Sequence, residues 1–198
     1  QGGDFSRIIR KGNSPADYTW EVTDKQGIKY IYGGEGAILK GTITDASGQS
    51  REVITEWKLK RVEETHGDYI EYVYETADEP VRGGLVAKAI YLKEVRAGNS
   101  GQSPHTVVVL EGSKQKRLKN NNARYGFLTS SNRLLEKLTV HFQGSTLRSY
   151  AFTYSEGAFN KDVLTGVKQL DDKGAEVSYQ NFDYYDDVQA AKGYVPFK

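Results

Sequence analysis

The three histidines are the side chains best suited to catalysis or metal binding, but their spacing favours neither use. They are His66, His105 and His141, which lie 39 and 36 residues apart. No second ligand stands close to any of them, so a three-histidine zinc site would require the fold to bring distant strands together. We expect His66 in a turn and the other two in strands, and we nominate no metal ligand and no cofactor.

Adjacent carboxylates offer a second kind of chemistry, because glycoside hydrolysis uses two acids that face each other across a cleft. The adjacent pairs are Glu63-Glu64, Asp171-Asp172 and Asp186-Asp187. Neighbours in a strand point to opposite faces, and two of the pairs border turns, so we interpret them as solvated acids. The glycine-rich segment 33–36 lacks the Lys-Ser/Thr of a phosphate-binding loop, and no serine lies in a G-x-S-x-G motif. The sequence therefore predicts no catalytic residue.

One basic run is a candidate for binding phosphate or nucleic acid. Residues 112–123 contain Lys114, Lys116, Arg117 and Lys119, together with three consecutive asparagines. The whole chain has 27 Lys and Arg against 26 Asp and Glu, a net charge of +1, so no bulk field attracts an anionic partner. We expect a solvated, mobile loop here and no nucleic-acid partner.

Tyrosine is the most abundant aromatic residue, with 14 copies beside seven Phe, two Trp, 21 Gly and four Pro. This composition is typical of many short strands joined by tight turns. Exposed tyrosines could stack on sugars, whereas tyrosines at alternate strand positions ordinarily pack on a half-buried sheet. A carbohydrate-binding β module that uses exposed tyrosines, with glycans as partners, is therefore the alternative to a structural role.

The chain has no cysteine, which excludes disulfides and thiolate metal sites. It also has no methionine, and its first residues, Gln1 to Asp4, show no signal pattern, so we expect a processed chain or an excised fragment. No apolar run approaches the roughly 20 residues of a membrane-spanning helix, and we predict no membrane span.

The elements that position these residues are predicted to be β-hairpins, the clearest of which covers residues 54–75. Trp57 and Leu59 alternate along the first run, so they would point to one face of a strand. Ile70, Tyr72 and Tyr74 alternate in the same way along the second run, and the turn between the two runs contains Gly67. We expect these five large residues to belong to the structural core.

Residues 18–33 form a second predicted hairpin, with its turn at Gly27. Trp20 and Val22 point one way, and Tyr30 and Tyr32 are their expected cross-strand partners. Trp20 is the sixth expected core residue.

A short pattern, Leu-x-x-Val/Leu, recurs four times along the chain. The copies begin at Leu59, Leu92, Leu135 and Leu164, and each is followed by a glycine-bearing turn and then a second strand-like run. Gly144 and Gly174 lie in the third and fourth turns. Residues 85–97 and 131–140 fit a strand or a helix equally well by periodicity alone. The recurrence favours strands and an irregular hairpin repeat.

Such hairpins cannot bury an apolar face alone, so we predict an all-β antiparallel meander, either one large twisted sheet or two packed sheets. We assign residues 1–198 to a single β domain. It comprises an edge strand and loop at 1–17, hairpin repeats at 18–186, and an exit tail at 187–198 whose Tyr194 and Phe197 would cover the sheet or contact another chain.

Four stretches together resemble the SpvB-like domain of the B component of insecticidal toxin complexes, within the wider group of RHS/YD-repeat toxins. They are residues 20–33, 57–74, 133–140 with 149–154, and 163–167 running on to 182–186. The chain differs from that family in having Gly67-Asp68 where Gly-Asn is usual, and it lacks the glycine-rich opening half of the domain.

The resemblance implies a structural role and YD/RHS-like repeated hairpins. In that family the domain belongs to a very large secreted or cell-surface protein, whose β-sheet shell encloses a separate toxic polypeptide. It also implies that the partners are other domains of the parent chain or toxin-complex components, and that any enzymatic activity resides in other domains. We therefore expect a non-catalytic scaffold segment.

Overall fold

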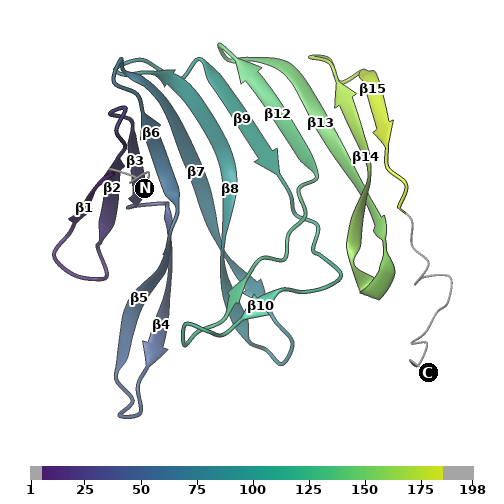
Figure 1. Ribbon diagram of the computed structural model, residues 1–198. Helices are drawn as coiled ribbons and strands as arrows, with labels where there is room; N and C mark the ends of the chain where they lie inside the picture. Colours follow the sequence, from purple (N-terminus) through teal and green to yellow (C-terminus); the bar gives the residue numbers. More distant parts are fainter. Residues whose placement is uncertain (1–5, 185–198) are drawn as a thin grey trace, which may run out of the picture.

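The computed structural model describes residues 6–184, which form strands and turns without an α-helix (Figure 1). The strands are β1 (Arg7–Lys11), β2 (Thr19–Thr23), β3 (Lys29–Gly33), β4 (Ile38–Thr44), β5 (Ser50–Trp57), β6 (Leu59–Glu63), β7 (Asp68–Pro80), β8 (Val86–Asn99), β9 (Thr106–Glu111), β10 (Asn121–Asn122), β11 (Thr129–Ser130), β12 (Lys137–Phe142), β13 (Ser145–Glu156), β14 (Asp162–Leu170) and β15 (Glu176–Asn181). A single 3-10 turn spans Ala158–Asn160. The expected exit tail at 187–198, with Tyr194 and Phe197, lies outside the described residues.

Most strands belong to one sheet of 13 strands, and β4 and β5 form a separate two-stranded sheet. The main path runs β1-β2-β3-β6-β7-β8-β9-β12-β13-β14-β15, so strands adjacent in sequence are mostly adjacent in space. The predicted all-β antiparallel meander is confirmed, and it takes the form of one large sheet. The four predicted repeat hairpins are β6-β7, β8-β9, β12-β13 and β14-β15.

The two ambiguous segments contain no helix. Residues 85–97 lie almost entirely in β8, which pairs with β7 along its whole length. Residues 131–136 run outside the regular strands, and β12 begins only at Lys137. The leucine pair that suggested a helix is therefore split between a connecting segment and a strand.

The predicted hairpin at 54–75 is wrong at its beginning. Trp57 ends β5 in the two-stranded sheet, whereas Leu59 begins β6 in the large sheet. The chain changes sheets at Lys58, whose amide donates to Ala37 and whose carbonyl accepts from Gly33. The hairpin itself starts at Leu59, because the Trp57 and Leu59 backbones bond to different partners. The predicted pairing of Trp20 with Tyr32, and of Val22 with Tyr30, is confirmed.

The register places most large apolar side chains on one side of the sheet. Residues that pair across strands share a face, and one such row joins Tyr72, Val95, Val108 and Val140. We call this side the apolar face. Its large side chains are Trp20, Val22, Tyr30, Tyr32, Leu59, Val62, Ile70, Tyr72, Tyr74, Leu92, Val95, Val108, Leu110, Leu138, Val140, Phe142, Tyr150, Phe152 and Val167.

The opposite side, the polar face, carries ion pairs and short polar residues. Arg96 contacts both Glu71 and Glu94, and the guanidinium of Arg61 lies 3.9 Å from the ring centre of Tyr69. The hydrogen bond to Glu94, together with the charges of Glu94 and Glu71, raises the pKa of Arg96. The antiparallel sheet therefore alternates apolar and polar faces, as expected when one face meets water and the other meets protein.

The apolar face is not a closed core, because none of its large side chains is buried. Ile70 is 39% exposed and Phe142 47% exposed, and the others are half-buried. This corrects the expected core at Trp20, Leu59, Ile70, Tyr72 and Tyr74. The physical reason is that no second layer covers this face in the described part of the chain, so these side chains are shielded only by their neighbours. Trp57 is also half-buried, beside Trp20, with ring centres 6.2 Å apart.

The best-buried region is instead a corner below the sheet, where three parts of the chain meet. These are the lower arms of β7 and β8, the β4-β5 hairpin, and the segment 112–136, which we call the strap. Ala37, Leu39, Ala87 and Ala89 are at most 3% exposed. A methyl group added at Gly41 would lie 2.5 Å from the ring of Phe127 in the strap, which shows how closely the hairpin and strap pack.

The four glycines predicted in turns all have positive φ. The values are 85° at Gly27, 94° at Gly67, 82° at Gly144 and 85° at Gly174. At Gly67, the amide donates to the carbonyl of Glu64 at 3.1 Å, which closes the β6-β7 turn. A side chain there would be strained, because L-residues other than glycine rarely adopt this conformation.

Candidate functional site: a window beside strand β8

The strap leaves the sheet after β9 and returns to it at β12, and it contains the basic run. The expected loop is largely exposed to solvent, and hydrogen bonds to distant parts of the chain hold it along its length. The amide of Lys116 donates to Asn132 at 2.6 Å, and that of Leu134 donates to Lys114 at 2.8 Å. Arg117 pairs with Asp162, and the amide of Lys88 donates to Leu128 of the strap. No local motif indicates these partners, because they are distant in the chain.

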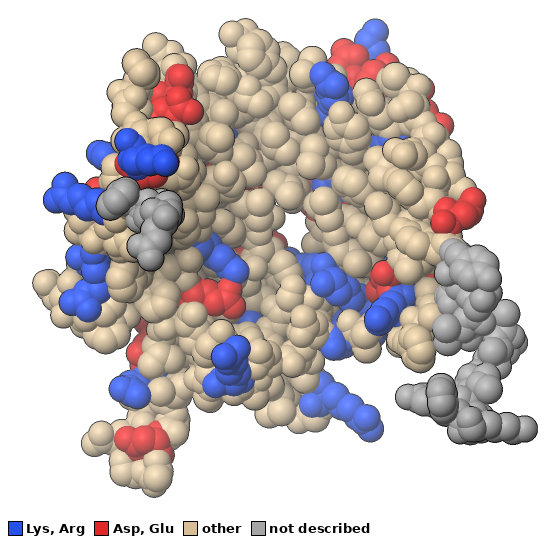
Figure 2. All heavy atoms as spheres, viewed as in Figure 1, with Lys and Arg blue, Asp and Glu red and all other residues tan. Residues whose placement is uncertain are grey.

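The strap separates β8 from its neighbour and leaves an opening in the sheet. Strand β8 pairs with β9 only from Glu94 to Ala97, and on the same side it next meets β11 at Lys88. Between these points β8 has no strand partner on that side among residues 6–184. Figure 2 shows an opening through the molecule near the centre of the view, where β8 and the end of β9 diverge in Figure 1. We call this opening the window.

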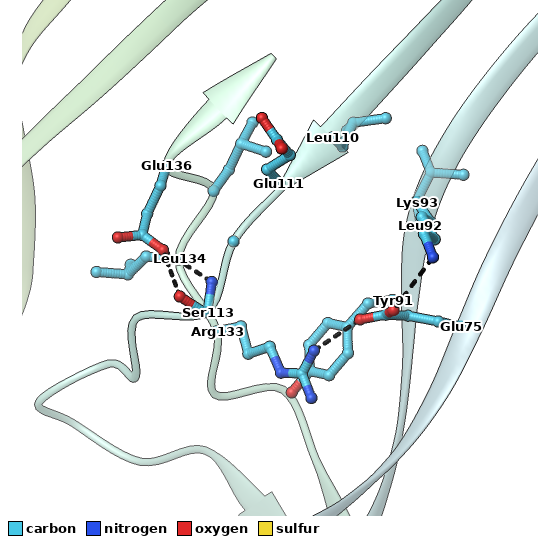
Figure 3. A pocket seen from close by; sticks show the side chains of 12 residues that line it. Glu75, Tyr91, Leu92, Lys93, Leu110, Glu111, Ser113, Arg133, Leu134 and Glu136 are labelled. Atoms are coloured by element: carbon cyan, nitrogen blue, oxygen red, sulfur yellow. Dashed lines mark hydrogen bonds and ion pairs between the residues drawn. The ribbon is translucent and has the colours of Figure 1, made fainter. Parts of the chain in front are cut away.

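A cavity of about 490 Å³ lies at the window (Figure 3). Its apolar wall consists of Leu92, Leu110, Leu134 and Leu135, which come from β8, β9 and the strap. Its polar wall comprises Glu75, Tyr91, Lys93, Glu111, Ser113, Arg133 and Glu136. The volume falls within the range of ordinary ligand pockets, and the mixture of leucines with a few charged groups suits recognition of a ligand with both characters.

Arg133 is the central polar group of the window. Its Nη1 donates to Glu75 at 2.7 Å and its Nε donates to Glu79 at 2.7 Å, while its guanidinium lies 4.6 Å from the ring centre of Tyr91. Glu79 is only 4% exposed and also accepts from Gln115. Burial alone would lower the pKa of Arg133, but the hydrogen bond to Glu79 and the charges of Glu79 and Glu75 raise it. Arg133 therefore ties the strap to β7 with a fixed charge.

Asn132 completes the attachment of the strap and is the largest fully buried side chain among the described residues, at 2% exposed. Its Oδ1 accepts from the amide of Asn120 at 2.6 Å, and its Nδ2 donates to Asn121 at 2.8 Å. Its own amide donates to the hydroxyl of Tyr91 at 3.2 Å. A buried amide side chain with both ends bonded fixes one conformation of the strap, because any other would leave these groups unpaired.

Glu136 lies at the opposite end of the cavity and acts as a cap. Its Oε2 accepts from the amides of Ser113 and Lys114, at 2.8 and 3.0 Å, and from the Ser113 hydroxyl. These hydrogen bonds, the Ser113 amide first, hold the pKa of Glu136 below its usual range. Glu136 is therefore an acceptor in the folded chain.

The carboxylates of the window are poorly disposed for acid-base catalysis. A general acid needs a raised pKa, whereas the pKa of Glu136 is lowered; Glu75 forms an ion pair with Arg133 at 2.7 Å. Within residues 6–184, no cluster of three or more His, Cys, Asp or Glu side chains could hold a metal ion. The arrangement suits binding better than bond making.

The other candidate residues are dispersed. His66 lies in a turn and His141 in β12 as expected, but His105 precedes β9 by one residue, in a bend, because the strand ladder starts at Thr106. Glu63 accepts from Arg61, and Asp171 caps its own turn by accepting from two amides. Asp186-Asp187 lies outside the described residues.

No helix in the described part of the chain is long and apolar enough to cross a membrane.

Sequence reasoning missed the window residues. Arg133 and Glu79 are 54 residues apart, and Asn132 and Tyr91 are 41 apart, so no local motif connects them. One available signal was the mismatch between a long apolar β8 and a short β9, which leaves part of β8 unpaired.

Several solved structures share this fold. The N-terminal domain of the effector protein SpvB from Salmonella typhimurium strain LT2 superposes with a TM-score of 0.63 and 17% identity, over 85% of this chain and 66% of that one. A TcdB2-TccC3 crystal structure gives 0.61 and 15%, over 88% of this chain and 11% of that one. The Photorhabdus luminescens Tc holotoxin pore gives 0.61 and 16%, over 87% and 10%.

These matches confirm the resemblance at the level of the fold. The chain spans 66% of the SpvB chain and about a tenth of the two Tc chains. No protein-family model and no curated protein sequence matches the chain.

Proposed function

We propose that this chain is a non-catalytic structural segment of a large, secreted or cell-surface toxin-like protein of the SpvB/RHS type. In this role the sheet is a wall: its polar face meets water, and its apolar face meets other domains of the parent chain or other components of the complex. The fold shared with SpvB and the Tc toxin chains supports the proposal.

One observation carries the proposal, namely the uncovered apolar face. It extends over neighbouring strands from β2 to β14, and its aromatic and aliphatic side chains are at best half-buried. Contiguous apolar surface of this kind normally marks an interface, because leaving it in water forgoes about 25 cal/mol for each Å². A wall that encloses or abuts other protein layers would cover it.

The polar face supports the same assignment. Its ion pairs are at least partly exposed, such as Lys168 with Glu176 at 2.8 Å, where the side chains are 43% and 46% exposed. Exposed pairs of this kind contribute little to stability but keep a broad sheet compatible with water. The two faces thus have the opposite chemistry that a single-layer wall requires.

Oxidative footprinting tests this role. Hydroxyl radicals should modify the half-buried apolar-face tyrosines Tyr30, Tyr72 and Tyr150 in the isolated chain, and much less in the natural parent protein. Tyr179 on the polar face is the control and should react similarly in both. Equal reactivity of the apolar-face tyrosines in the two proteins would contradict the proposal.

Carbohydrate binding has less support. Among the tyrosines of residues 6–184, the exposed ones are Tyr125, Tyr179 and Tyr184. Tyr125 lies on the strap, Tyr179 lies in β15, and Tyr184 follows β15. They therefore form no obvious stacking platform. Binding on a glycan array that is abolished by replacing one of them with alanine would favour this alternative over the scaffold.

A further inference from the structure

Strand β8 lies in the middle of the large sheet and yet has a stretch that lacks a strand partner on one side. Its partner β9 stops at the pair Glu94 with Val109, and its other partner on that side, β11, contacts it only at Lys88. Backbone groups inside a sheet are normally paired, because an unpaired N–H or C=O away from water is costly. This gap in a central strand is the feature that the wall role leaves unexplained.

The direction of the free backbone groups follows from the ladder. The amide of Lys88 points away from β7, since it donates to Leu128 of the strap at 2.8 Å. Alternate residues of a strand point to the same side, so the backbone amides and carbonyls of Ile90 and Leu92 also point away from β7, and Leu92 lines the cavity. Lys93 is the extra residue of a bulge, because Tyr74 pairs with Leu92 while Val73 pairs with Glu94. The stretch without a strand partner on this side therefore centres on Ile90 and Leu92.

The window has the shape and the precedent for a short added strand. The cavity of about 490 Å³ runs beside this stretch of β8 and is walled by Leu92, Leu110 and Leu134. The strap already uses the adjoining position, because Thr129 pairs with Lys88 in parallel. A strand side with free donors and acceptors is a template for another extended segment.

We propose that the window binds an extended polypeptide segment, which adds to the free side of β8 as a short strand. The backbone of the segment bonds to Ile90, and its alternate side chains contact the leucines of the cavity. This site does not depend on the structural role proposed above.

The charges of the window select the other side chains of the segment. Three carboxylates line the cavity, Glu75, Glu111 and Glu136, against the two cations Lys93 and Arg133. Glu111 is the carboxylate with the weakest contact, 3.9 Å to Lys137, and its side chain is 56% exposed. A lysine or arginine in the segment would pair with it. The preferred segment therefore alternates apolar and basic residues.

The probe is a labelled, end-blocked hexapeptide of alternating valine and lysine, measured by fluorescence anisotropy and by amide exchange of the full 198-residue chain. In the free chain the Ile90 amide should exchange much faster than the Tyr91 amide, which faces β7. The hexapeptide should slow exchange at Ile90. A hexapeptide N-methylated at alternate residues cannot form the ladder and should bind at least tenfold more weakly.

Ile90→Pro removes the amide that faces the window without removing a bond to β7, and it should weaken hexapeptide binding at least tenfold. Ile90→Val keeps the amide and is the matched control, with binding unchanged. Circular dichroism shows whether each variant is folded. If Ile90→Pro unfolds the chain, the test rests on two measurements of the unmutated chain: its binding of the N-methylated hexapeptide and the exchange rate of its Ile90 amide.

Three results would overturn the proposal. The first is equal binding of the plain and N-methylated hexapeptides, which would assign the site to side-chain contacts only. The second is protection confined to the edge strands β1 or β15, with exchange at Ile90 unchanged. The third is no binding of the hexapeptide at millimolar concentration.

Discussion

The upper sheet and the corner below it are built from the same strands, yet they differ in how they are stabilised. In the upper sheet, β7 and β8 carry large residues such as Tyr72 and Val95 that are only half-buried. Further down the same strands, Ala87 and Ala89 are 0% exposed because the strap and the β4-β5 hairpin cover them. Ala87 and Ala89 are buried although they are small, whereas Tyr72 and Val95 are only half-buried, so burial at these positions depends on what covers the strand and not on the size of the apolar side chain.

The chain therefore has one closed region, the corner, and one open region, the upper sheet. In the corner, the buried side chains of Glu79 and Asn132 are both hydrogen-bonded, Glu79 to Arg133 and Asn132 to Asn120. The upper sheet satisfies its backbone through the ladder but leaves its apolar side chains to be covered by something else. Substitutions in the corner should therefore cost more than similar substitutions in the upper sheet.

The largest effect is expected from Arg133→Ala. It leaves Glu79, whose side chain is 5% exposed, as a buried charge without its main partner. Breaking a buried pair in this way costs about 3 to 5 kcal/mol of unfolding free energy. Urea denaturation measures it, and Lys168→Ala, which breaks an exposed pair, should change the same quantity by less than about 1 kcal/mol. Equal losses of unfolding free energy in the two variants would contradict the proposed difference between the corner and the upper sheet.

The next prediction compares two aliphatic truncations. Leu39→Ala removes a side chain that is 3% exposed in the corner, and it should cost about 2 to 4 kcal/mol through lost burial and a cavity. Ile70→Ala removes one that is 39% exposed on the apolar face, and it should cost about 1 kcal/mol. The midpoints of urea unfolding give both values. A larger loss for Ile70→Ala would mean that the upper sheet contains a core after all.

Trp57→Ala tests the junction between the two regions. Trp57 donates from Nε1 to the carbonyl of Tyr18 at 2.6 Å and packs edge-on against Trp20. Because the side chain is half-buried, we expect a loss of about 2 to 3 kcal/mol, below the range for a fully buried tryptophan. Trp57→Phe keeps a ring and should lose about 1 kcal/mol. A thermal midpoint for Trp57→Ala within a degree or two of the parent would contradict this.

The smallest effect concerns acid. The pKa of Glu136 in the folded chain lies below its ordinary value of 4.5, so its contribution is complete above that value and is lost as the pH falls through the folded pKa. Amide exchange at Ser113 and Lys114 should therefore accelerate below about pH 4.5, relative to the rest of the sheet. In Glu136→Gln that pH dependence should disappear. An unchanged profile in the variant would show that Glu136 does not hold this end of the strap.

The fold was more predictable than the site. Local signals such as Gly67 and Gly174 in turns, and the paired aromatic residues Trp20 and Tyr32, were enough to place the hairpins and their order. The sheet change at Lys58 was invisible, because the alternation through Thr55, Trp57 and Leu59 continues across it while the hydrogen-bond partners change. The core was mispredicted because large alternating residues indicate a buried face only where a second layer exists.

The site could not be predicted because its contacts join distant residues. The basic run at 114–119 looks like a solvated loop, and its partners, among them Asp162 and Asn132, carry no motif. Glu79 resembles an ordinary turn acid beside Pro80, yet it is buried because the strap returns over β7. Such positions depend on the tertiary path, which local periodicity does not encode.

Dye binding measures whether the apolar face is open in this chain. Val95, Val108 and Val140 form a row across β8, β9 and β12 on that face. The isolated chain should bind anilinonaphthalene sulfonate with strong fluorescence, and changing all three valines to threonine should remove most of the signal while circular dichroism stays the same. The control changes Val107 and Val109, on the opposite face of β9, and should leave the signal nearly intact. An open apolar face would be contradicted if the unmutated chain bound no dye, or if both variants lost the same share of the fluorescence.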